Sequence, residues 1–561
     1  MRSTFQFRTS SVLFRTALVL FGLLAAPHPA VLAQARFSPA VLQEALRDAG
    51  PPTAQAQSSA AQPAAQAAEP QTRRMTVEEA VKLALENNLG IQISRFNPLV
   101  QDLNVVQART GWSPTLTNNF QTTSTDSPNN NFLAGGQGLK TSDDRFINTM
   151  GVQQTLKWGT QYNVGWDGSR LTTNNAFTTF SPQLRSSLAL SVTQPLLRGF
   201  GIDDIRQQVE QALKNREIAD VQVRQTIAST LRTVRNAYWN LAFAHASLRV
   251  QQQSLELAQE SLRNTRSRVE IGTTPPIDIV EAESEVAQRD EAAIVAEAQI
   301  QTAEDTLRAL VFDLASPDFW TVHIEATDLP PFQPLTVDVD AAVRNALSKR
   351  TDLQERAKNI ELNDVNIRYL RNQTLPEVTA NFDYGLSGIG GTQLQRGVGP
   401  FGPGTGAVIG QSQRGFGTVL SDLFTNDFPN WTASLNISYP LGTSNAQAGL
   451  ARTRLQNSQA QAQLKNQQLQ VATQVREAAR QVQTNQKRVE STRVSRTLGE
   501  KRLEAEQRKL AAGTSTSFVV FQTQRDLAVA RNNELRAILD FNQSVVDLET
   551  VQEIPLGGIA P

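Results

Sequence analysis

The sequence predicts a mainly α-helical protein with a smaller amount of membrane-type β structure, built from two tandem repeats. The first observation is an unusually long heptad pattern that ends at a glycine. The second is that the same pattern recurs about 240 residues later, in the same register relative to a second glycine. The third is that segments with strictly alternating apolar and polar residues precede each long helix. Each repeat is therefore expected to contain a helix, a strand pair, a long helix and a shorter helix.

The predicted helix at 203–271 is the longest element of the first repeat. One column of apolar residues recurs at seven-residue spacing: Ile227, Val234, Leu241, Leu248, Leu255, Leu262 and Val269. This period predicts a helix that follows a partner helix in a left-handed supercoil. The companion column begins apolar at Leu231 and Tyr238 and is polar from His245 to Arg266, so the apolar contact narrows toward Gly272. At 1.5 Å per residue, the helix is a rod of about 100 Å, far longer than one globular core needs.

The two repeats are expected at 76–312 and 337–549, with a linker at 313–336 between them. Thr76 and Glu79 form a capping box that starts the first helix. The first repeat is predicted to contain a helix at 76–110, strands at 113–125 and 186–196, an extra hairpin at 147–168, the long helix and a helix at 277–312. The second is predicted to contain a helix at 338–373, strands at 376–386 and 431–441, a long helix at 445–512 and a helix at 517–549. The heptad register of both long helices is counted back from the turn glycines Gly272 and Gly513.

The N-terminus predicts export. Three arginines precede the apolar run 17–26, and small residues offer a cleavage site before Gln34, so residues 1–33 have the pattern of a signal peptide. Residues 34–75 are expected to be a flexible leader rich in Pro, Ala and Gln, and residues 550–561 a short C-terminal tail. The mature chain contains no other stretch with the length and apolarity of a membrane helix, so a membrane-embedded part would have to be a β-barrel.

The alternating segments fit such a barrel. Trp431, Leu435 and Ile437 alternate with polar residues, and strands of about ten residues with aromatic ends have the dimensions of barrel strands. A soluble β-sandwich would show the same alternation, but the strands are too few for two sheets and are separated by long loops at 127–145 and 388–429. One chain supplies four strands, or six with the extra hairpin, which is too few to close a barrel. Because open edges cannot face lipid, the chain is expected to share its barrel with copies of itself.

Two short motifs and the two turns match a known family. Gln194-Pro195-Leu196 and Tyr439-Pro440-Leu441 stand where strand passes into long helix, and the turns read 271–278 and 512–516. Over about residues 76–553, the chain resembles the TolC-type outer membrane efflux proteins, or outer membrane factors. The resemblance implies a homotrimer with an α-helical barrel that extends from the outer membrane into the periplasm, and a shared transmembrane β-barrel of twelve strands. The extra hairpin either extends the barrel to eighteen strands or folds over its mouth and leaves a barrel of twelve.

The resemblance also implies a function and partners. The chain is expected to be the passive exit channel of a tripartite efflux or type I secretion system, embedded in outer-membrane lipid. A periplasmic adaptor (membrane fusion) protein and an inner-membrane pump are the implied partners, and no nucleic acid is expected. The transported substrate and the particular pump are left open.

The implied sites lie near the two turns. The residues of the expected adaptor-docking tip are Gly272, Thr273, Thr274, Asp278, Gly513, Thr514 and Ser515. Where the family places two aspartates at the tunnel entrance, this chain has Val519 and Gln522, and the family's tyrosine and arginine fall at Leu510 and Ser515. The candidate constriction is therefore Val519, Gln522, Arg525 and Asp526. A ring of Val519 and Phe521 would gate by dewetting, or the segment 518–521 simply packs between helices.

The composition argues against other classes of protein. The formal charge is zero, cysteine is absent and only three histidines occur, so no nucleic-acid binding, thiolate site or histidine-rich metal site is expected. No nucleophile triad, carboxylate pair or phosphate loop stands out, so no enzymatic activity and no cofactor are predicted. Two rivals remain, a periplasmic adaptor and an extended structural coiled-coil protein. An adaptor would have one helical hairpin inserted in a β-domain, and a coiled-coil protein would lack the strand pairs.

Overall fold

The structure, a computed structural model, describes residues 72–129, 140–175, 177–315, 319–328, 332–399 and 402–553. The expected signal peptide, most of the leader and the end of the C-terminal tail lie outside these ranges. All described elements belong to one compact unit that begins at Pro70.

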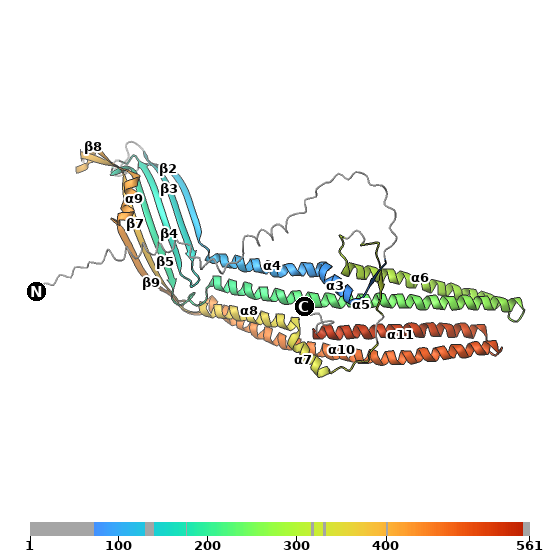
Figure 1. Cartoon of the computed structure of the whole chain (residues 1–561). Coiled ribbons are helices and arrows are strands. Elements are labelled where there is room, and N and C mark those ends of the chain that lie inside the picture. Colours follow the sequence, from blue (N-terminus) through green and yellow to red (C-terminus); the bar gives the residue numbers. More distant parts are fainter. Residues whose placement is uncertain are drawn as a thin grey trace, which may run out of the picture. The chain divides into compact units, whose positions relative to one another are not determined.

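Two long antiparallel helical hairpins dominate this unit (Figure 1). The first consists of α5 (Asp204–Glu270) and α6 (Ile277–Val311), and the second of α10 (Asn445–Ala511) and α11 (Ser517–Gln552). Helices α5 and α10 both have 67 residues, and each ends at a residue two positions before its turn glycine. The helices form at the positions that the heptad patterns predict. None of the helices in the described ranges is both long and apolar enough to cross a membrane.

The heptad columns form the interior of each hairpin. Val234 and Leu241 of α5 are fully buried and pack with Leu307 of α6, while Val475 and Val482 of α10 are buried in the second cluster. Helix α11 packs on α10 and also on α5, so the two hairpins lie side by side. The apolar seam continues to the far end of the second hairpin, where Leu503, Val520 and Leu527 form a small separate cluster.

The shorter helix that opens each repeat is broken, where the sequence predicted one continuous helix. The first consists of α3 (Val77–Asn87) and α4 (Leu89–Arg109), and its counterpart of α7 (Val339–Lys349) and α8 (Thr351–Gln373). Asn88 and Arg350 adopt extended backbone angles at the breaks. The Asn88 side chain caps α4 by accepting from the backbone N–H of Ile91, and Glu553 accepts from the N–H and hydroxyl of Thr351. These capping contacts compensate for the interrupted helical hydrogen bonds.

A small parallel sheet joins the leader to the linker, and here the predicted boundaries are wrong. Strand β1 (Thr72–Met75) lies within the expected flexible leader, and β6 (His323–Ala326) lies within the expected linker. The pairing is stable because Met75 is buried and its carbonyl oxygen accepts a hydrogen bond from the buried Tyr238 hydroxyl at 3.0 Å. Only long-range contacts specify these four-residue strands, so no local pattern predicts them.

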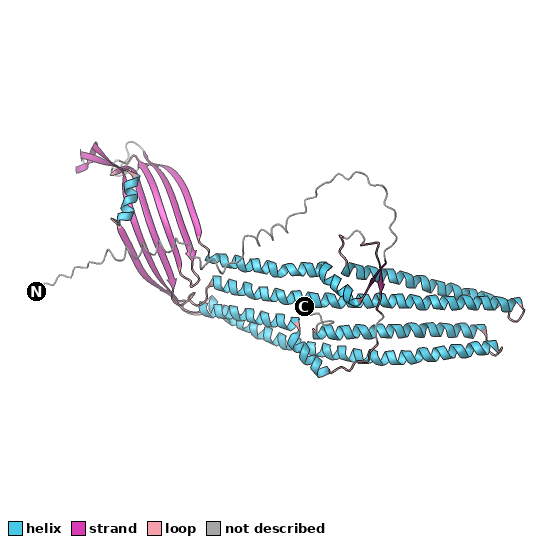
Figure 2. Cartoon of the chain, viewed as in Figure 1, coloured by secondary structure: helices cyan, strands magenta, loops and turns pink. Residues whose placement is uncertain are grey.

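The remaining described strands form one seven-stranded antiparallel sheet (Figure 2). Six of them follow the spatial order β2 (Thr115–Pro128), β3 (Lys140–Thr155), β4 (Gln161–Thr173), β5 (Phe180–Pro195), β7 (Glu377–Gly399) and β9 (Pro429–Ser438), and the seventh, β8 (Gly402–Arg414), pairs with the C-terminal part of β7. The extra hairpin, expected at 147–168, is β3 and β4, and it lies between the two strands of the first repeat. Strands β2, β5, β7 and β9 each connect to a long helical segment at the same end of the sheet (Figure 1). The short turn between β3 and β4 lies at that end as well.

The described part of 388–429 contains regular structure, contrary to the predicted long loop. Strand β7 continues to Gly399 and pairs with β8 (Gly402–Arg414), and helix α9 (Phe416–Thr425) then packs against β7 and β5. A Cβ atom at Gly388 or Gly390 would meet Val419 of α9 at less than 3 Å. The glycines that suggest a loop therefore allow a helix to lie close to the sheet.

Candidate functional site

The two turns at the far ends of the helical hairpins are built identically. Gly272 has φ +77° and donates its backbone N–H to the carbonyl of Val269, while the N–H of Thr273 reaches the carbonyl of Arg268 at 2.9 Å. In the second repeat, Gly513 has φ +73° and bonds to Leu510, while Thr514 bonds to Lys509 at 2.9 Å. This pair of bonds is the Schellman motif, which requires a left-handed residue and so favours glycine. The threonine hydroxyls bond to the same carbonyls.

The residues of the expected docking tip lie on these turns and remain accessible. Gly272, Thr273, Gly513 and Thr514 are exposed, and Thr274, Asp278 and Ser515 are partly exposed. The tip also exposes apolar side chains: Ile271, Ile277, Val280 and Phe518. The Ser515 hydroxyl is engaged with Glu506 at 3.0 Å, so it helps to fix the second turn. The tip is therefore a pair of hydrogen-bonded turns whose surface combines apolar side chains with hydroxyl groups.

The four candidate constriction residues do not share one environment. Val519, Gln522 and Asp526 follow one exposed stripe of α11, with Val519 37% exposed and the Gln522 amide bonded to Asp526 at 3.1 Å. Phe521 is only 3% exposed, so a ring of Val519 and Phe521 is not available in the chain as it is folded here. The structure thus buries one half of segment 518–521 and leaves Phe518 and Val519 outside.

Arg525 points elsewhere and contacts the other hairpin. Its guanidinium lies 3.6 Å from the carboxylate of Glu285 on α6. The Glu285 side chain is 5% exposed and also accepts a hydrogen bond from Arg289 at 2.8 Å. We call these three residues the Glu285 bridge. The sequence did not indicate a role for Glu285. The spacing of Glu285 and Arg289 suggests only an ion pair within one helix, and the third member of the bridge, Arg525, lies 240 positions from Glu285.

Several polar contacts join the two hairpins, and the Glu285 bridge is the one nearest the turns among the described residues. Nearer the sheet, side chains of α5 bond to side chains of α11: Arg232 to Asp547, Arg235 to Glu549, Asn240 to Gln543, Ser247 to Asn532 and Gln253 to Arg531. Within the described ranges, no hydrogen bond or ion pair joins the hairpins closer to the turns than the Glu285 bridge. Among the polar contacts that the structure describes between the hairpins, this cluster is therefore the one nearest the tips.

A second charge cluster joins the two repeats closer to the sheet. Lys214 and Glu217 of α5 alternate with Lys358 and Glu361 of α8. Lys214 pairs with Glu361 and Lys358 with Glu217 across the two helices, both at 2.8 Å, and each lysine also pairs with the glutamate of its own helix at 3.1–3.2 Å. The hydrogen bond from Lys358 is the main reason that the pKa of Glu217 lies below its ordinary value, and Lys214 lowers the pKa of Glu361 in the same way. The same bonds raise the pKa of both lysines. The cluster is charged throughout the neutral range.

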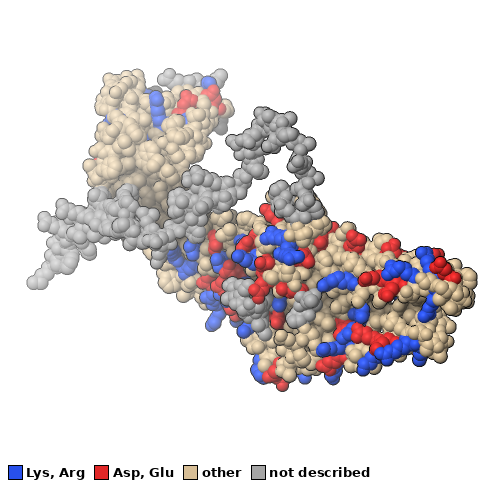
Figure 3. Space-filling model, turned by 45° about the vertical axis from the view of Figure 1, so that its right-hand side comes forward, with Lys and Arg blue, Asp and Glu red and all other residues tan. Residues whose placement is uncertain are grey.

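The sheet has two chemically distinct faces. Because the register is continuous across six strands, one cross-strand row places Trp431, Tyr384, Leu190, Val164, Val152 and Leu116 on one face. The adjacent row places Thr432, Asp383, Ser191, Asn163, Gln153 and Thr115 on the other. In Figure 3 the visible part of the sheet carries few charged residues, whereas the helices carry many. One apolar and one polar face is the pattern of a wall between lipid and water.

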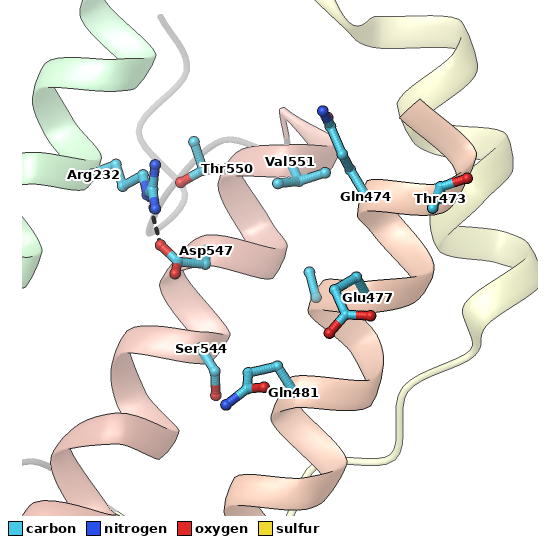
Figure 4. Close-up of a pocket in the computed structure, with 10 residues that line it drawn as sticks. Arg232, Thr473, Gln474, Glu477, Gln481, Ser544, Asp547, Thr550 and Val551 are labelled. Carbon is cyan, nitrogen blue, oxygen red and sulfur yellow. Dashed lines mark hydrogen bonds and ion pairs between the residues drawn. The ribbon is translucent and has the colours of Figure 1, made fainter. Parts of the chain in front are cut away.

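One pocket lies within the helical part of the described chain. A pocket of about 480 Å³ lies between α10 and α11, and Arg232 of α5 reaches Asp547 at its edge (Figure 4). Neutral side chains such as Gln474, Gln481 and Ser544 make up much of its lining. No group of His, Cys, Asp and Glu in the described part of the chain has the arrangement of a metal site. A lining of largely uncharged polar side chains is typical of a surface in contact with water.

Several solved structures share this fold. The outer membrane channel CmeC of Campylobacter jejuni aligns with a TM-score of 0.59 at 12% identity, over 85% of both chains. The outer membrane protein VceC of Vibrio cholerae aligns at 0.58 and 15% identity, over 85% of this chain and 95% of its own. The open state of the outer membrane channel MtrE of Neisseria gonorrhoeae aligns at 0.57 and 16% identity, over 85% and 88%. No curated protein matches the chain significantly.

The family comparison covers most of the folded chain. The profile described as outer membrane efflux protein matches residues 80–311 and 342–551, which are the two structural repeats. This match confirms the resemblance that the strand-to-helix motifs and turns indicated, and it favours neither the adaptor nor the structural coiled-coil reading. The family is one of channels rather than of enzymes. The chain belongs to the outer membrane efflux protein family.

Proposed function

We propose that three copies of this chain form the outer-membrane exit channel of a tripartite efflux system. The sheet would form the wall in the outer membrane, and the helical hairpins would extend into the periplasm. The channel would be a passive conduit, with transport driven by its partners. Secretion of proteins through the same conduit is the alternative use.

The observation that carries this proposal is the two-faced sheet with open edges. Among the strands that the structure describes, β2 pairs only with β3 and β9 only with β7, so the other edge of each presents backbone groups without a strand partner. Such edges cost several kcal/mol per group in lipid unless another strand covers them. A neighbouring copy supplies the complementary edge, and repetition of that contact around an axis closes a ring.

The partners follow from the far end of the molecule. The exposed tip residues Ile271, Ile277 and Phe518, together with the hydroxyls of Thr273 and Thr514, offer a mixed surface to another protein. We assign this tip to a periplasmic adaptor, which would connect the channel to an inner-membrane pump. The exposed stripe of Val519, Gln522 and Asp526 would line the tunnel close to that contact.

Two measurements on the purified protein test the proposal together. The chain should migrate as a detergent-stable trimer, and it should conduct ions when inserted in a planar bilayer. A monomer in detergent that gives no conductance would refute the channel assignment. Docking is tested separately, because Thr273→Lys with Thr514→Lys at the tip should abolish efflux in cells while the trimer and its bilayer conductance persist.

A further inference from the structure

We infer that the β3–β4 hairpin is part of the membrane wall, so that each chain contributes six strands and the closed trimer has eighteen. This inference rests on the proposed trimeric channel and deepens it, because the number of strands sets the width of the outlet. Barrel diameter grows roughly in proportion to strand number, so eighteen strands give an outlet about 1.5-fold wider than twelve.

The pairing of the hairpin with its neighbours is the first support. Strand β3 pairs with β2 from Thr115↔Gln153 to Pro128↔Lys140 without a register shift, and β4 pairs with β5 over eleven residues, likewise without a shift. A hairpin folded over the mouth of a barrel would leave β2 and β5 to pair with each other. Here they are separated by both strands of the hairpin.

The side chains of the hairpin continue both faces of the sheet. Val152 and Val164 stand in the apolar row, while Gln153 and Asn163 stand in the polar row. Trp166 lies on the apolar face, where its indole N–H donates to the Ser186 hydroxyl at 2.8 Å. A buried or lipid-facing indole needs such a partner, so this contact suits a position at the membrane. A hairpin exposed to water on both sides would have no reason to keep the two faces in register.

The ends of the hairpin also have the polarity of a barrel strand pair. Its tight turn contains Gly159, and the Leu156 N–H bonds to the carbonyl of Thr160 at 2.7 Å. The turn lies at the helical end, because the Gln154 amide donates to the carbonyl of Trp112 and a Cβ at Gly159 would meet the carbonyl of Gly199. Short turns on the periplasmic side and longer connections on the outer side are the rule for outer-membrane barrels.

The widths of the two layers provide an independent argument. The helices that join the sheet pack in the order α4-α5-α8-α10, which gives twelve in a trimer. Twelve helices aligned side by side, with axes 8–10 Å apart, need a circumference of about 95–120 Å. Eighteen strands at a spacing of about 4.8 Å and a tilt of about 40° supply about 113 Å, whereas twelve supply about 75 Å. With six strands per chain, the circumference of the β-barrel therefore matches that of the ring of helices.

The experiment exploits the absence of cysteine from the chain. Val164→Cys and Asn163→Cys in β4 are each labelled with a small fluorophore, and the trimer is reconstituted into vesicles. The matched controls are Leu190→Cys and Ser191→Cys, their register partners in β5. Brominated lipid should quench the label at 164 as strongly as at 190, and iodide should quench the label at 163 as strongly as at 191. If either variant fails to assemble, Val152→Cys and Gln153→Cys in β3 serve the same purpose.

The possible outcomes separate the inference from the function on which it rests. Iodide quenching at both hairpin positions, with the β5 controls still divided between lipid and water, would overturn the eighteen-strand barrel and leave the channel intact. A loss of the division at the β5 controls would refute the membrane wall itself, and the inference with it.

Discussion

At the scale of single residues, charged side chains with little solvent exposure form ion pairs that join helices distant in sequence. Glu285 is almost fully buried and holds Arg289 on its own helix and Arg525 on the other hairpin. Arg496 occupies a heptad position of α10 and pairs with Glu500 and Glu534 instead of interrupting the seam. Such residues hold their helices together, because separating the helices would leave a poorly solvated charge without its partner.

The Glu285 bridge is predicted to restrain the opening of the tip. Glu285→Gln should weaken the contact between the two hairpins by about 1.5–3 kcal/mol per subunit, because the charge-assisted bonds to Arg289 and Arg525 are lost. Single-channel recordings should then show a higher mean conductance. Glu283→Gln is the control, because Glu283 forms an exposed pair with Arg266 within one hairpin. Equal mean conductance of the wild type and Glu285→Gln would show that the Glu285 bridge does not restrain the opening of the tip.

Val519 is predicted to line the tunnel entrance. Counted from the turn glycines, Val519 of the second repeat corresponds to Asp278 of the first, so Val519→Asp reproduces a residue that the first turn already tolerates. A ring of added carboxylates should shift the selectivity of the channel toward cations. Reversal potentials in a salt gradient measure this shift. An unchanged reversal potential would show that Val519 faces away from the pore.

Tyr238 is predicted to hold the small parallel sheet in place. Its hydroxyl is fully buried, donates to the carbonyl of Met75 and accepts from the N–H of Asp328 at 3.1 Å. Tyr238→Phe leaves that N–H unsatisfied, at a cost of about 1–3 kcal/mol. Hydrogen exchange should accelerate in β1 and at residues 323–328. Protection equal to that of the wild type would contradict the role assigned to this hydroxyl.

At the scale of elements, the repeats agree in their turns and differ in their strands. Both turns are Schellman motifs that end helices of equal length, so the hairpins are set from the same reference point. Among the described elements, the inserted hairpin β3–β4 occurs in the first repeat, whereas β8 and α9 occur in the second.

The Lys214–Glu217–Lys358–Glu361 cluster should make the joint between α5 and α8 pH-dependent. The lowered carboxyl pKa values mean that this stabilisation is present above the unfolded value of 4.5 and is lost as pH falls through the folded values. The raised lysine pKa values mean that it is present below 10.5 and is lost as pH rises further. Because the groups are partly exposed, the whole cluster contributes only about 1 kcal/mol.

The thermal midpoint of Glu217→Gln/Glu361→Gln, compared with wild type, checks this prediction. The variant should be less stable near pH 7, and the difference should vanish well below pH 4.5. A difference that persists unchanged at pH 3 would show that the glutamates act through packing rather than charge.

Local periodicity explains which elements the sequence could predict. The long helices and the alternation of β7 and β9 repeat a short period many times, so they are visible in the sequence, and the turn glycines mark where the helices end. The helix breaks at Asn88 and Arg350, the strands β1 and β6, and the three-way contact at Glu285 depend on partners about 200 to 250 positions away. No local pattern contains that information.

At the scale of the whole molecule, the chain is an incomplete wall joined to long helices. Its sheet has an apolar face, a polar face and two open edges, and none of these features suits a protein that works alone. Three copies would turn the polar face into a water-filled lumen and bury the edges. The hairpin β3–β4 would then widen the outlet to the width of the helical layer.

A direct image of the assembled barrel tests this account most sharply. Single-particle electron microscopy of the protein in lipid nanodiscs, viewed along the channel axis, counts the subunits and the strands in the wall. We predict three subunits and eighteen strands in one closed ring, with β2 of each subunit beside β9 of the next. A closed ring with four strands from each subunit, or a particle in which β2 and β9 remain unpaired, would contradict it.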